Sequence, residues 1–546
     1  MPAHRPWLAA YGDMPAEIDA DAHPSVVALL DEAMQRHANR TAFVAFGQRL
    51  SYGEVDRLSA RLAGHLQRDL GVAKGDRVAV MLPNLAAFPI ALLAIARIGA
   101  VQVNVNPLYT PRELAHQLQD SGSKVIVIFN GATPTLAGII GQTGVQTVIT
   151  AAPGDGLPVA LPAPPVDARL AHAIPLASIL GGADPGQYLT PPLAGTDLLF
   201  LQYTGGTTGV SKGAALSHRN IIANVQQFKA IAPNALREGR EVVVTAIPLY
   251  HIFALTTNFI CCFSIGAENW LVPNPRDMEA FINVLRDARP TLMTGVNTIF
   301  AGIAAHPRAA EIDFSRLRLA GGGGTAVVEA TAQRWQALTG TSIREGYGLS
   351  ETSPIVSFNT EQASAFNGTT GVPVPSTDVR LLTEAGQDAA PGESGEVCVK
   401  GPQVMSGYWQ QPEASAAAFT ADGYFRTGDI GVFTPEGLLK IVDRKKDMII
   451  VSGFNVFPNE VEAVAMACPG VAEAACVGVA DERSGEAVRL YAVRTPGSEL
   501  TAEQLLDHCR GEMTAYKVPR QVVFIDALPK SAVGKVLRRE LRDSAA

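Results

Sequence analysis

The pattern of apolar and polar positions predicts alternating helices and strands over much of the chain. Leucines that recur every four residues between polar neighbours predict an amphipathic helix at Leu58, Leu62, Leu66 and Leu70. Short apolar or β-branched runs predict strands at 77–82, 124–129, 147–150 and 198–201. This alternation favours an α/β architecture with largely parallel sheets.

Residues 242–267 form a long stretch without Asp, Glu, Lys or Arg, and its length exceeds the ~20 residues that cross a bilayer. Polar residues interrupt it, among them Pro248, His251 and Asn258. We therefore favour a strand ending near Pro248, followed by a buried helix, over the alternative of a membrane span. Residues 1–10 carry no export signature.

Two further segments indicate how the chain is divided. Residues 153–192 are rich in Pro, Gly and Ala, and are expected to form a surface excursion that links two halves of a large domain. The clearest boundary lies at the charged residues 443–447, between predicted strands at 437–442 and 448–451. A polar connector between two strands suits a hinge, although the same pattern is also typical of a solvated turn.

Composition narrows the classes of function. A chain of 546 residues is expected to form two or more domains, and 47% hydrophobic residues suffice for large buried sheets. The net charge of −8 argues against nucleic acid as a partner. Six cysteines without a Cys-x-x-Cys pair argue against disulfides or structural zinc, and fit the cytoplasm. The adjacent Cys261 and Cys262 are expected to be core thiols.

Residues 203–213, YTGGTTGVSKG, follow the predicted strand at 198–201 and suggest a phosphate-binding loop. Glycines allow sharp bends that bring backbone N–H groups close to an anion, while the hydroxyl groups and Lys212 add donors and positive charge. It is not a Walker A loop, because Lys212 precedes a glycine rather than Ser or Thr. The alternative is a flexible surface turn.

This loop resembles the phosphate loop of the adenylate-forming (AMP-binding) superfamily, and other superfamily motifs follow in order along the chain. These are PLYH at 248–251, GYGLSE at 346–351, RTGD at 426–429, DRKKD at 443–447 and PKSAVGK at 529–535. The segments 103–114, 404–409, 443–458 and 528–541 are similar to bacterial long-chain fatty acyl-CoA synthetases. The resemblance implies a large N-terminal domain (1–442), a hinge (443–447) and a small, mobile α+β C-terminal domain (448–546).

The resemblance also implies a role for individual residues. Those expected to bind ATP or AMP are Tyr203, Thr204, Gly205, Gly206, Thr207, Thr208, Gly209, Lys212, Gly322, Gly323, Gly324, Tyr347, Gly348, Ser350, Asp429 and Arg444. Lys535, His251 and Glu351 are expected to be catalytic, with Glu351 also a Mg²⁺ ligand. Lys446 would be the hinge pivot, and Ser452 and Gly453 would line the path of CoA.

Each of these assignments has a plainer alternative. By pattern alone, His251 is a core histidine, Tyr347 a packing residue and Glu351 a surface carboxylate. Asp429 and Arg444 could form a surface ion pair, and Lys535 could belong to a solvated basic face. The family often has Pro where this chain has Ala326, so details of the loop after Gly324 stay open.

The implied reaction joins an acid to a thiol. ATP would convert a fatty acid to acyl-AMP with release of pyrophosphate, and CoA would then displace AMP. An aryl- or medium-chain ligase and an adenylation enzyme that loads a carrier protein share these motifs, whereas a kinase is disfavoured because the Walker pattern is missing. The residues leave open a peripheral contact with the inner face of the membrane, and homodimer formation.

Overall fold

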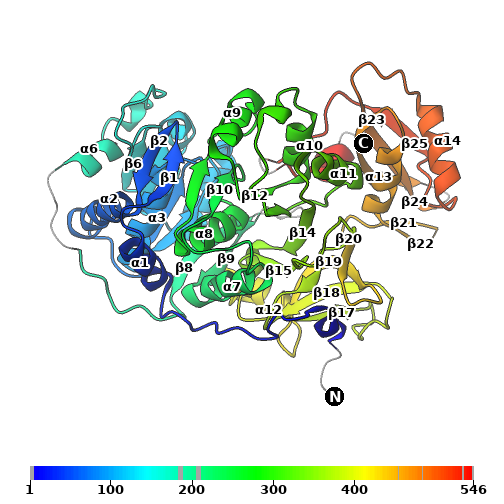
Figure 1. The fold of residues 1–546 in the computed structure, drawn as a ribbon, viewed down its shortest axis with the longest axis horizontal. Helices are drawn as coiled ribbons and strands as arrows, with labels where there is room; N and C mark the ends of the chain where they lie inside the picture. Colours follow the sequence, from blue (N-terminus) through cyan, green and yellow to red (C-terminus); the bar gives the residue numbers. More distant parts are fainter. Residues whose placement is uncertain are drawn as a thin grey trace.

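The computed structural model describes residues 5–182, 188–204, 211–452, 454–481, 484–531 and 534–543. Two large sheets, mostly parallel, form the body of the molecule, and a smaller C-terminal unit lies at one end (Figure 1). The seven-stranded sheet has the order β7 (Ile174–Pro175), β6 (Thr147–Ala151), β5 (Val125–Phe129), β3 (Arg77–Met81), β4 (Val101–Asn104), β8 (Leu198–Thr204) and β9 (Lys212–Ser217). The nine-stranded sheet has the order β16 (Val372–Pro373), β15 (Ile355–Phe358), β14 (Ile343–Gly348), β13 (Leu319–Gly322), β12 (Leu292–Gly295), β10 (Val242–Thr245), β11 (Glu268–Leu271), β1 (Thr41–Ala45) and β2 (Gln48–Ser51).

The two remaining sheets are mainly antiparallel. One has the order β17 (Asp378–Leu382), β18 (Gly395–Lys400), β19 (Phe425–Phe433) and β20 (Leu439–Arg444). The C-terminal sheet has the order β22 (Phe454–Val456), β21 (Ile449–Val451), β24 (Gly485–Arg494) and β23 (Val471–Asp481), with β25 (Gln521–Phe524) parallel to β24.

The helices of the first half pack on the two parallel sheets. They are α1 (Val26–Arg36), α2 (Tyr52–Gly64), α3 (Ala87–Arg97), α4 (Pro111–Ser121), α5 (Thr133–Ala137), α6 (Leu176–Gly181) and α7 (His218–Ile231). Helix α3 is buried at every position, as expected for a helix that is apolar on all sides. The later helices are α8 (Cys262–Ser264), α9 (Met278–Ala288), α10 (Asn297–Ala305), α11 (Glu329–Thr339), α12 (Pro412–Ala417), α13 (Pro458–Ala467), α14 (Ala502–Glu512) and α15 (Arg538–Asp543).

The predicted elements are confirmed with small changes at their ends. The strands expected at 77–82, 124–129, 147–150 and 198–201 are β3, β5, β6 and β8. The leucine repeat forms α2 and the π-helical turn His65–Asp69 that continues it, with Leu58, Leu62 and Leu66 buried. The predicted α/β class with parallel sheets and a small α+β C-terminal unit is therefore confirmed.

The uncharged segment 242–267 folds inside the body, as the preferred interpretation predicted. It forms β10, a π-helix at Ala254–Cys261 and the short α8, and the π-helix is buried throughout. Among the described residues, no helix combines the length and the apolar character that a bilayer crossing requires. All six cysteines are buried free thiols.

Two boundary predictions differ from the structure. The excursion at 153–192 joins strands of a single sheet rather than two halves, because its edge strand β7 pairs with β6 and the chain then returns as β8. Strand β20 continues to Arg444, because Asp443 and Arg444 still pair with Ile430 and Asp429. Residues 445–447 form the turn that follows β20, with Lys446 exposed in it, and the hinge at 443–447 stays a prediction.

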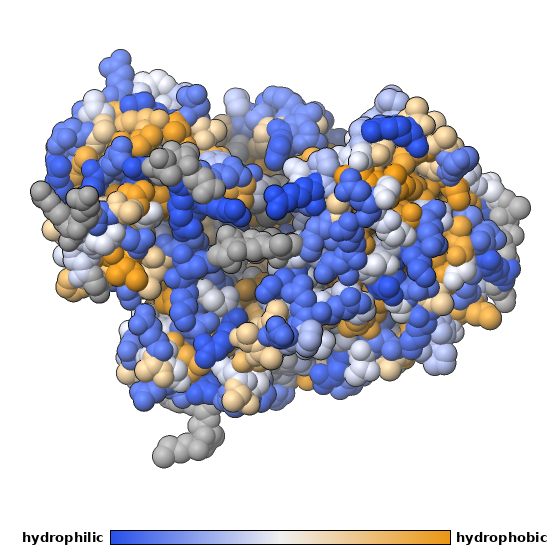
Figure 2. Space-filling model, turned by 180° about the vertical axis from the view of Figure 1, so that it is seen from behind, coloured by the Kyte–Doolittle hydropathy of each residue, from blue (hydrophilic) through white to orange (hydrophobic). Residues whose placement is uncertain are grey.

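The surface is mixed in character. On the face opposite that of Figure 1, apolar residues lie in separate patches, and hydrophilic residues cover most of the middle (Figure 2). The N-terminal segment crosses to the β17–β20 sheet, where Trp7 stacks on Phe433 at 5.2 Å between ring centroids.

Candidate active site

The expected phosphate loop joins two paired strands. Strands β8 and β9 form an antiparallel hairpin in which Thr204 is opposite Lys212. The loop residues Gly205, Gly206, Thr207, Thr208 and Gly209 lie outside the described residues. The hydroxyl of Tyr203 donates to Asp120 Oδ2 at 2.5 Å. Its ring would be 3.1 Å from a Cβ on Gly213, so the aromatic side chain packs against its cross-strand neighbour Gly213.

A tyrosine that sequence reasoning did not single out connects Lys212 to Glu351. Lys212 Nζ lies 5.1 Å from the centre of the Tyr408 ring, within the range of a cation–π contact. The Tyr408 hydroxyl donates to Glu351 Oε1 at 3.0 Å. The backbone around it is pinned to β9, because Trp409 N donates to Gly213 O at 2.8 Å. In the sequence, the 404–409 motif marks this segment only through its resemblance to the family and does not indicate what Tyr408 contacts.

Glu351 has the chemistry of a magnesium ligand. Its side chain is buried, and burial raises the pKa of the carboxyl, while the hydrogen bond from Tyr408 lowers it. In the part of the chain that the structure describes, no three His, Cys, Asp or Glu side chains gather as a metal site. Mg²⁺ is commonly held by one or two carboxylates together with substrate phosphates, so a lone carboxylate fits a metal that arrives with a nucleotide.

The residues expected at the adenosine form one connected group. The Tyr347 hydroxyl donates to Asp429 Oδ2 at 2.6 Å, and Arg444 Nε lies 3.6 Å from Asp429 Oδ1. Asp429 and Arg444 thus pair with each other, as the plainer alternative suggested, but Asp429 is only 6% exposed and is not a surface residue. Burial raises the pKa of Asp429, and Arg444 opposes that rise.

Gly322, at the start of the glycine run 322–324, and Gly348 lie where a side chain would collide. A Cβ on Gly322 would be 2.7 Å from Val327 Cγ2, and one on Gly348 would be 2.1 Å from the carbonyl oxygen of Pro354. Gly324 has a φ of +78°, which favours glycine, and Gly323 faces Phe253. Ser350 follows as the first residue of the 3₁₀ turn Ser350–Thr352.

Glu345 is a second residue that the sequence did not reveal. It lies in β14, is 8% exposed, and accepts a hydrogen bond from Val327 N at 3.2 Å, which ties β14 to the loop after Gly324. Burial raises the pKa of this carboxyl to about 8. No pattern in the sequence distinguishes such a glutamate from an exposed one.

His251 ends the segment that leaves β10. Its backbone N–H donates to Pro248 O at 3.0 Å, and its Nδ1 accepts from Phe253 N at 3.3 Å. Burial lowers the pKa of the imidazole to about 4, so the ring is neutral near pH 7. Because Phe253 also faces Gly323, the histidine segment and the glycine run are neighbours.

The turn that carries Lys535 reaches the large unit. A Cβ on Gly534 would lie 3.1 Å from Thr298 Oγ1 and 3.4 Å from Val296 Cγ2. Val296 also lies 3.5 Å from the position of a Cβ on Gly324, so the lysine turn borders the glycine run. The C-terminal unit and α10 are adjacent in Figure 1 as well.

The basic residues around Lys535 do not form a uniform solvated face, which was the plainer alternative. The Arg538 side chain is 14% exposed and contacts Glu462 Oε1 at 2.8 Å, and Lys530 pairs with Glu473. Ser452, expected on the path of CoA, is exposed in the β21–β22 turn and has a φ of +52°. Gly453 lies outside the described residues.

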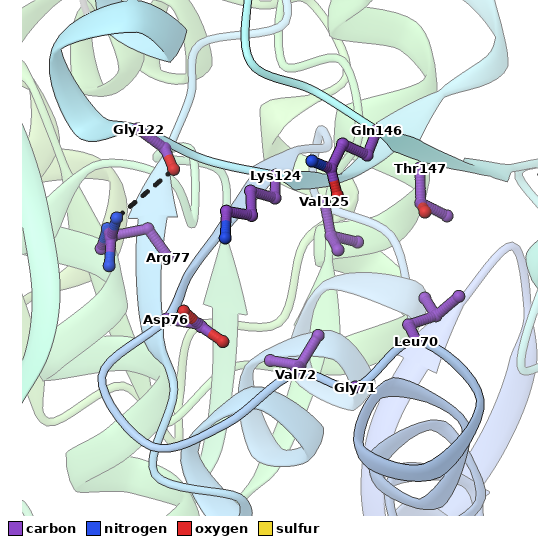
Figure 3. Close-up of a pocket in the computed structure, with 10 residues that line it drawn as sticks. All are labelled: Leu70, Gly71, Val72, Asp76, Arg77, Gly122, Lys124, Val125, Gln146 and Thr147. Atoms are coloured by element: carbon purple, nitrogen blue, oxygen red, sulfur yellow. Dashed lines mark hydrogen bonds between the residues drawn. The ribbon is translucent and has the colours of Figure 1, made fainter.

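A cavity of about 140 Å³ lies elsewhere, at the residues where β3, β5 and β6 begin (Figure 3). Its lining includes Asp76, Lys124 and Gln146, while Arg77 is turned toward Gly122 O. In open parallel sheets, ligands bind beyond the carboxyl ends of the strands. The candidate residues Thr204, Gly322 and Gly348 lie at those ends, so the candidate site lies there and not at this cavity.

Comparisons with known proteins identify the family. The model of the AMP-binding enzyme family matches residues 30–409, and that of the AMP-binding enzyme C-terminal domain matches 460–535. The chain therefore belongs to the AMP-binding enzyme family. It is 48% identical to a long-chain-fatty-acid–CoA ligase of Salmonella typhimurium over 99% of this chain and 98% of that protein.

Two further relatives bear on the chemistry. A feruloyl-CoA synthase of an Amycolatopsis species is 36% identical over 93% of this chain and 96% of its own length. The crystal structure of ATP-bound MatB from Rhodopseudomonas palustris superposes with a TM-score of 0.84 and 30% identity, covering 95% of this chain and 99% of that one.

Proposed function

We propose that this protein is an AMP-forming long-chain fatty acid–CoA ligase. It activates a fatty acid with ATP to acyl-AMP and pyrophosphate, and then forms acyl-CoA with release of AMP. The observation that carries the proposal is the 48% identity, over nearly the whole of both chains, to a long-chain-fatty-acid–CoA ligase.

The residues divide the chemistry between charge compensation and orientation. A carboxylate attacks the α-phosphorus poorly because both partners are anionic, so cations must lie where the two approach. Lys535 supplies a mobile charge beside the glycine run, and Lys212 supplies another at the phosphate loop. Glu351 would hold Mg²⁺, and the ion would supply further positive charge at the phosphates.

Orientation comes from the buried polar groups. Asp429 presents two acceptor oxygens to the ribose hydroxyls, and its position is set by Tyr347 and Arg444. The Tyr347 ring offers an apolar face to the adenine, next to the backbone of the glycine run. His251, neutral because desolvation lowers its pKa to about 4, lies beside that run and would orient the acid where it meets the phosphate.

The proposal includes the division of the chain at residues 443–447. Residues 1–442 would bind ATP and the acid, and residues 448–546 would pivot about Lys446 after adenylation. Ser452 and Gly453 would then line the path of the thiol. The contact of Gly534 with Val296 and Thr298 suits the adenylation step, because it brings the Lys535 turn to the glycine run.

An aryl-CoA ligase is the second candidate, because a feruloyl-CoA synthase is 36% identical over 93% of the chain. The two differ in the acid that they accept. We would therefore incubate the protein with ATP, Mg²⁺ and CoA, offer acetate, octanoate, palmitate or coumarate, and measure AMP, pyrophosphate and thioester.

Preference for palmitate is the expected result, and preference for coumarate would transfer the protein to the aryl class. AMP without a CoA thioester would favour carrier loading, and ADP with orthophosphate would refute adenylation altogether. Omission of Mg²⁺ should abolish turnover. Gel filtration and flotation with vesicles test the remaining expectations, which are a homodimer and a peripheral membrane contact of a cytoplasmic enzyme.

A further inference from the structure

A buried asparagine of one sheet holds the backbone that carries His251 in the other. Asn84 lies three residues after β3 of the seven-stranded sheet and is 3% exposed. The segment 245–251 leaves β10 of the nine-stranded sheet and ends at His251. The two segments meet in the interior between the sheets.

Three hydrogen bonds join the side-chain amide of Asn84 to this one segment. Its Nδ2 donates to Thr245 O and to Ile247 O, each at 3.0 Å, and its Oδ1 accepts from Leu249 N at 2.7 Å. A segment that leaves a sheet loses its ladder partners, and each buried backbone group then needs another partner. Asn84 supplies that partner for Ile247 O and Leu249 N, whereas Thr245 O also accepts a hydrogen bond from Val272 N of the neighbouring strand segment at 3.0 Å.

A second side chain, that of Gln202, bonds to the backbone of Tyr250, the residue before His251. Gln202 Nε2 donates to Tyr250 O at 3.1 Å, and Gln202 Oε1 accepts from Asn104 Nδ2 at 2.9 Å. Gln202 and Asn104 belong to β8 and β4 of the same seven-stranded sheet. The seven-stranded sheet, which also contains both strands that flank the phosphate loop, therefore fixes the backbone before His251.

Among the described residues, the ring of His251 has one hydrogen bond. Its Nδ1 accepts a long hydrogen bond from Phe253 N at 3.3 Å, within the same backbone turn. The position of the ring therefore follows the path of residues 245–251. A displacement of about 1 Å in a catalytic group can cost about 100-fold in rate, so a residue that determines this path affects turnover without touching substrate.

We propose that Asn84 is a positioning residue for the adenylation step, and that it acts through His251. The inference rests on the proposed function, because it assigns His251 to the junction of the acid and the phosphate. Asn84 does not contribute chemistry itself. It presents a fixed amide to a backbone that would otherwise have several conformations.

The test is a double-mutant cycle between Asn84→Ala and His251→Ala. The measured quantity is the rate of palmitate-dependent pyrophosphate release, at a temperature well below the melting temperature of every variant. Asn84→Ala should lower kcat about 10- to 100-fold and leave KM for ATP within about twofold. In the His251→Ala background, Asn84→Ala should cause no further loss, because residues that act as a unit are not additive. Additive losses, or an unchanged kcat in the single variant, would overturn the proposal.

Two controls separate positioning from general stability. Tyr52→Phe removes a buried hydroxyl that donates to the carbonyls of Ala267 and Phe263, away from the histidine segment. It should lower the melting temperature but preserve kcat. Asn84→Ser keeps one donor and should give an intermediate loss, and the cycle is repeated with it if Asn84→Ala does not fold.

The pH profile gives a readout that a purely structural role would not change. Burial lowers the pKa of His251 to about 4, so protonation of His251 should not limit adenylation by the wild type above about pH 5. A loosened segment would hydrate the ring, and the acid limb of Asn84→Ala should rise toward the ordinary pKa of about 6.5. If the acid limb of the pH profile is the same in Asn84→Ala and in the wild type, the proposal is wrong. If the wild type releases no pyrophosphate with any carboxylic acid substrate, the proposed function is refuted instead.

Discussion

Replacing Glu345 by Gln should remove a pH-dependent loss of stability from this protein. The carboxyl is 8% exposed, and burial raises its pKa from 4.5 to about 8, so it is protonated in the folded state at neutral pH. Glutamine has nearly the same shape and stays neutral, and its Oε1 can still accept from Val327 N. The variant therefore reproduces the neutral form at every pH.

The magnitude follows from the difference between the folded and unfolded pKa values. Because the folded pKa is the higher one, the stabilisation from Glu345 is complete below pH 4.5 and is lost as the pH rises to about 8. At about 1.4 kcal/mol per pKa unit, the whole loss is about 5 kcal/mol, most of it between pH 5 and 9. If the 546 residues unfold as one unit, this corresponds to about 4 °C in Tm.

The assay is thermal unfolding of both proteins from pH 5 to pH 9. The Tm of Glu345→Gln minus that of the wild type should be small at pH 5 and should rise by about 4 °C at pH 9. Other buried carboxyls titrate alike in both proteins and cancel in this difference. Replacement of the exposed Glu384 by Gln is the matched control, and its difference should stay near zero. A difference for Glu345→Gln that is constant with pH would refute the reasoning.

Three further predictions concern the charges of the site. Lys535→Ala should lose adenylation at least 100-fold and still convert supplied acyl-AMP and CoA to thioester, and equal losses in both half-reactions would contradict a role confined to adenylation. Tyr408→Phe removes the hydrogen bond that lowers the pKa of Glu351. The Mg²⁺ concentration for half-maximal rate should therefore rise about 5- to 10-fold, and more at pH 6 than at pH 8. An unchanged Mg²⁺ titration would exclude this link. Asp429→Asn should raise KM for ATP about 10-fold or more through the lost charge-assisted bonds to ribose, with isothermal titration of AMP as the check; unaltered AMP affinity would remove Asp429 from the ribose site.

The sequence by itself determined the local elements and the family. Strands β3, β5, β6 and β8 and helix α2 follow from short-range periodicity, which depends only on which side chains must face a core. The motifs at 203–213 and 346–351 were sufficient to place the chain among AMP-binding enzymes. Their spacing could not reveal which of their residues contact each other.

Only the tertiary structure decided the contacts across long sequence separations. Tyr408 meets Glu351 and Lys212 because residues 407–409 pair with β9, and no local pattern encodes that pairing. Asn84 reaches residues 245–249 because the segments that follow β3 and β10 meet in the folded protein. Burial of Glu345 and His251 moves their pKa values in opposite directions, and burial is a property of the packed molecule rather than of either residue.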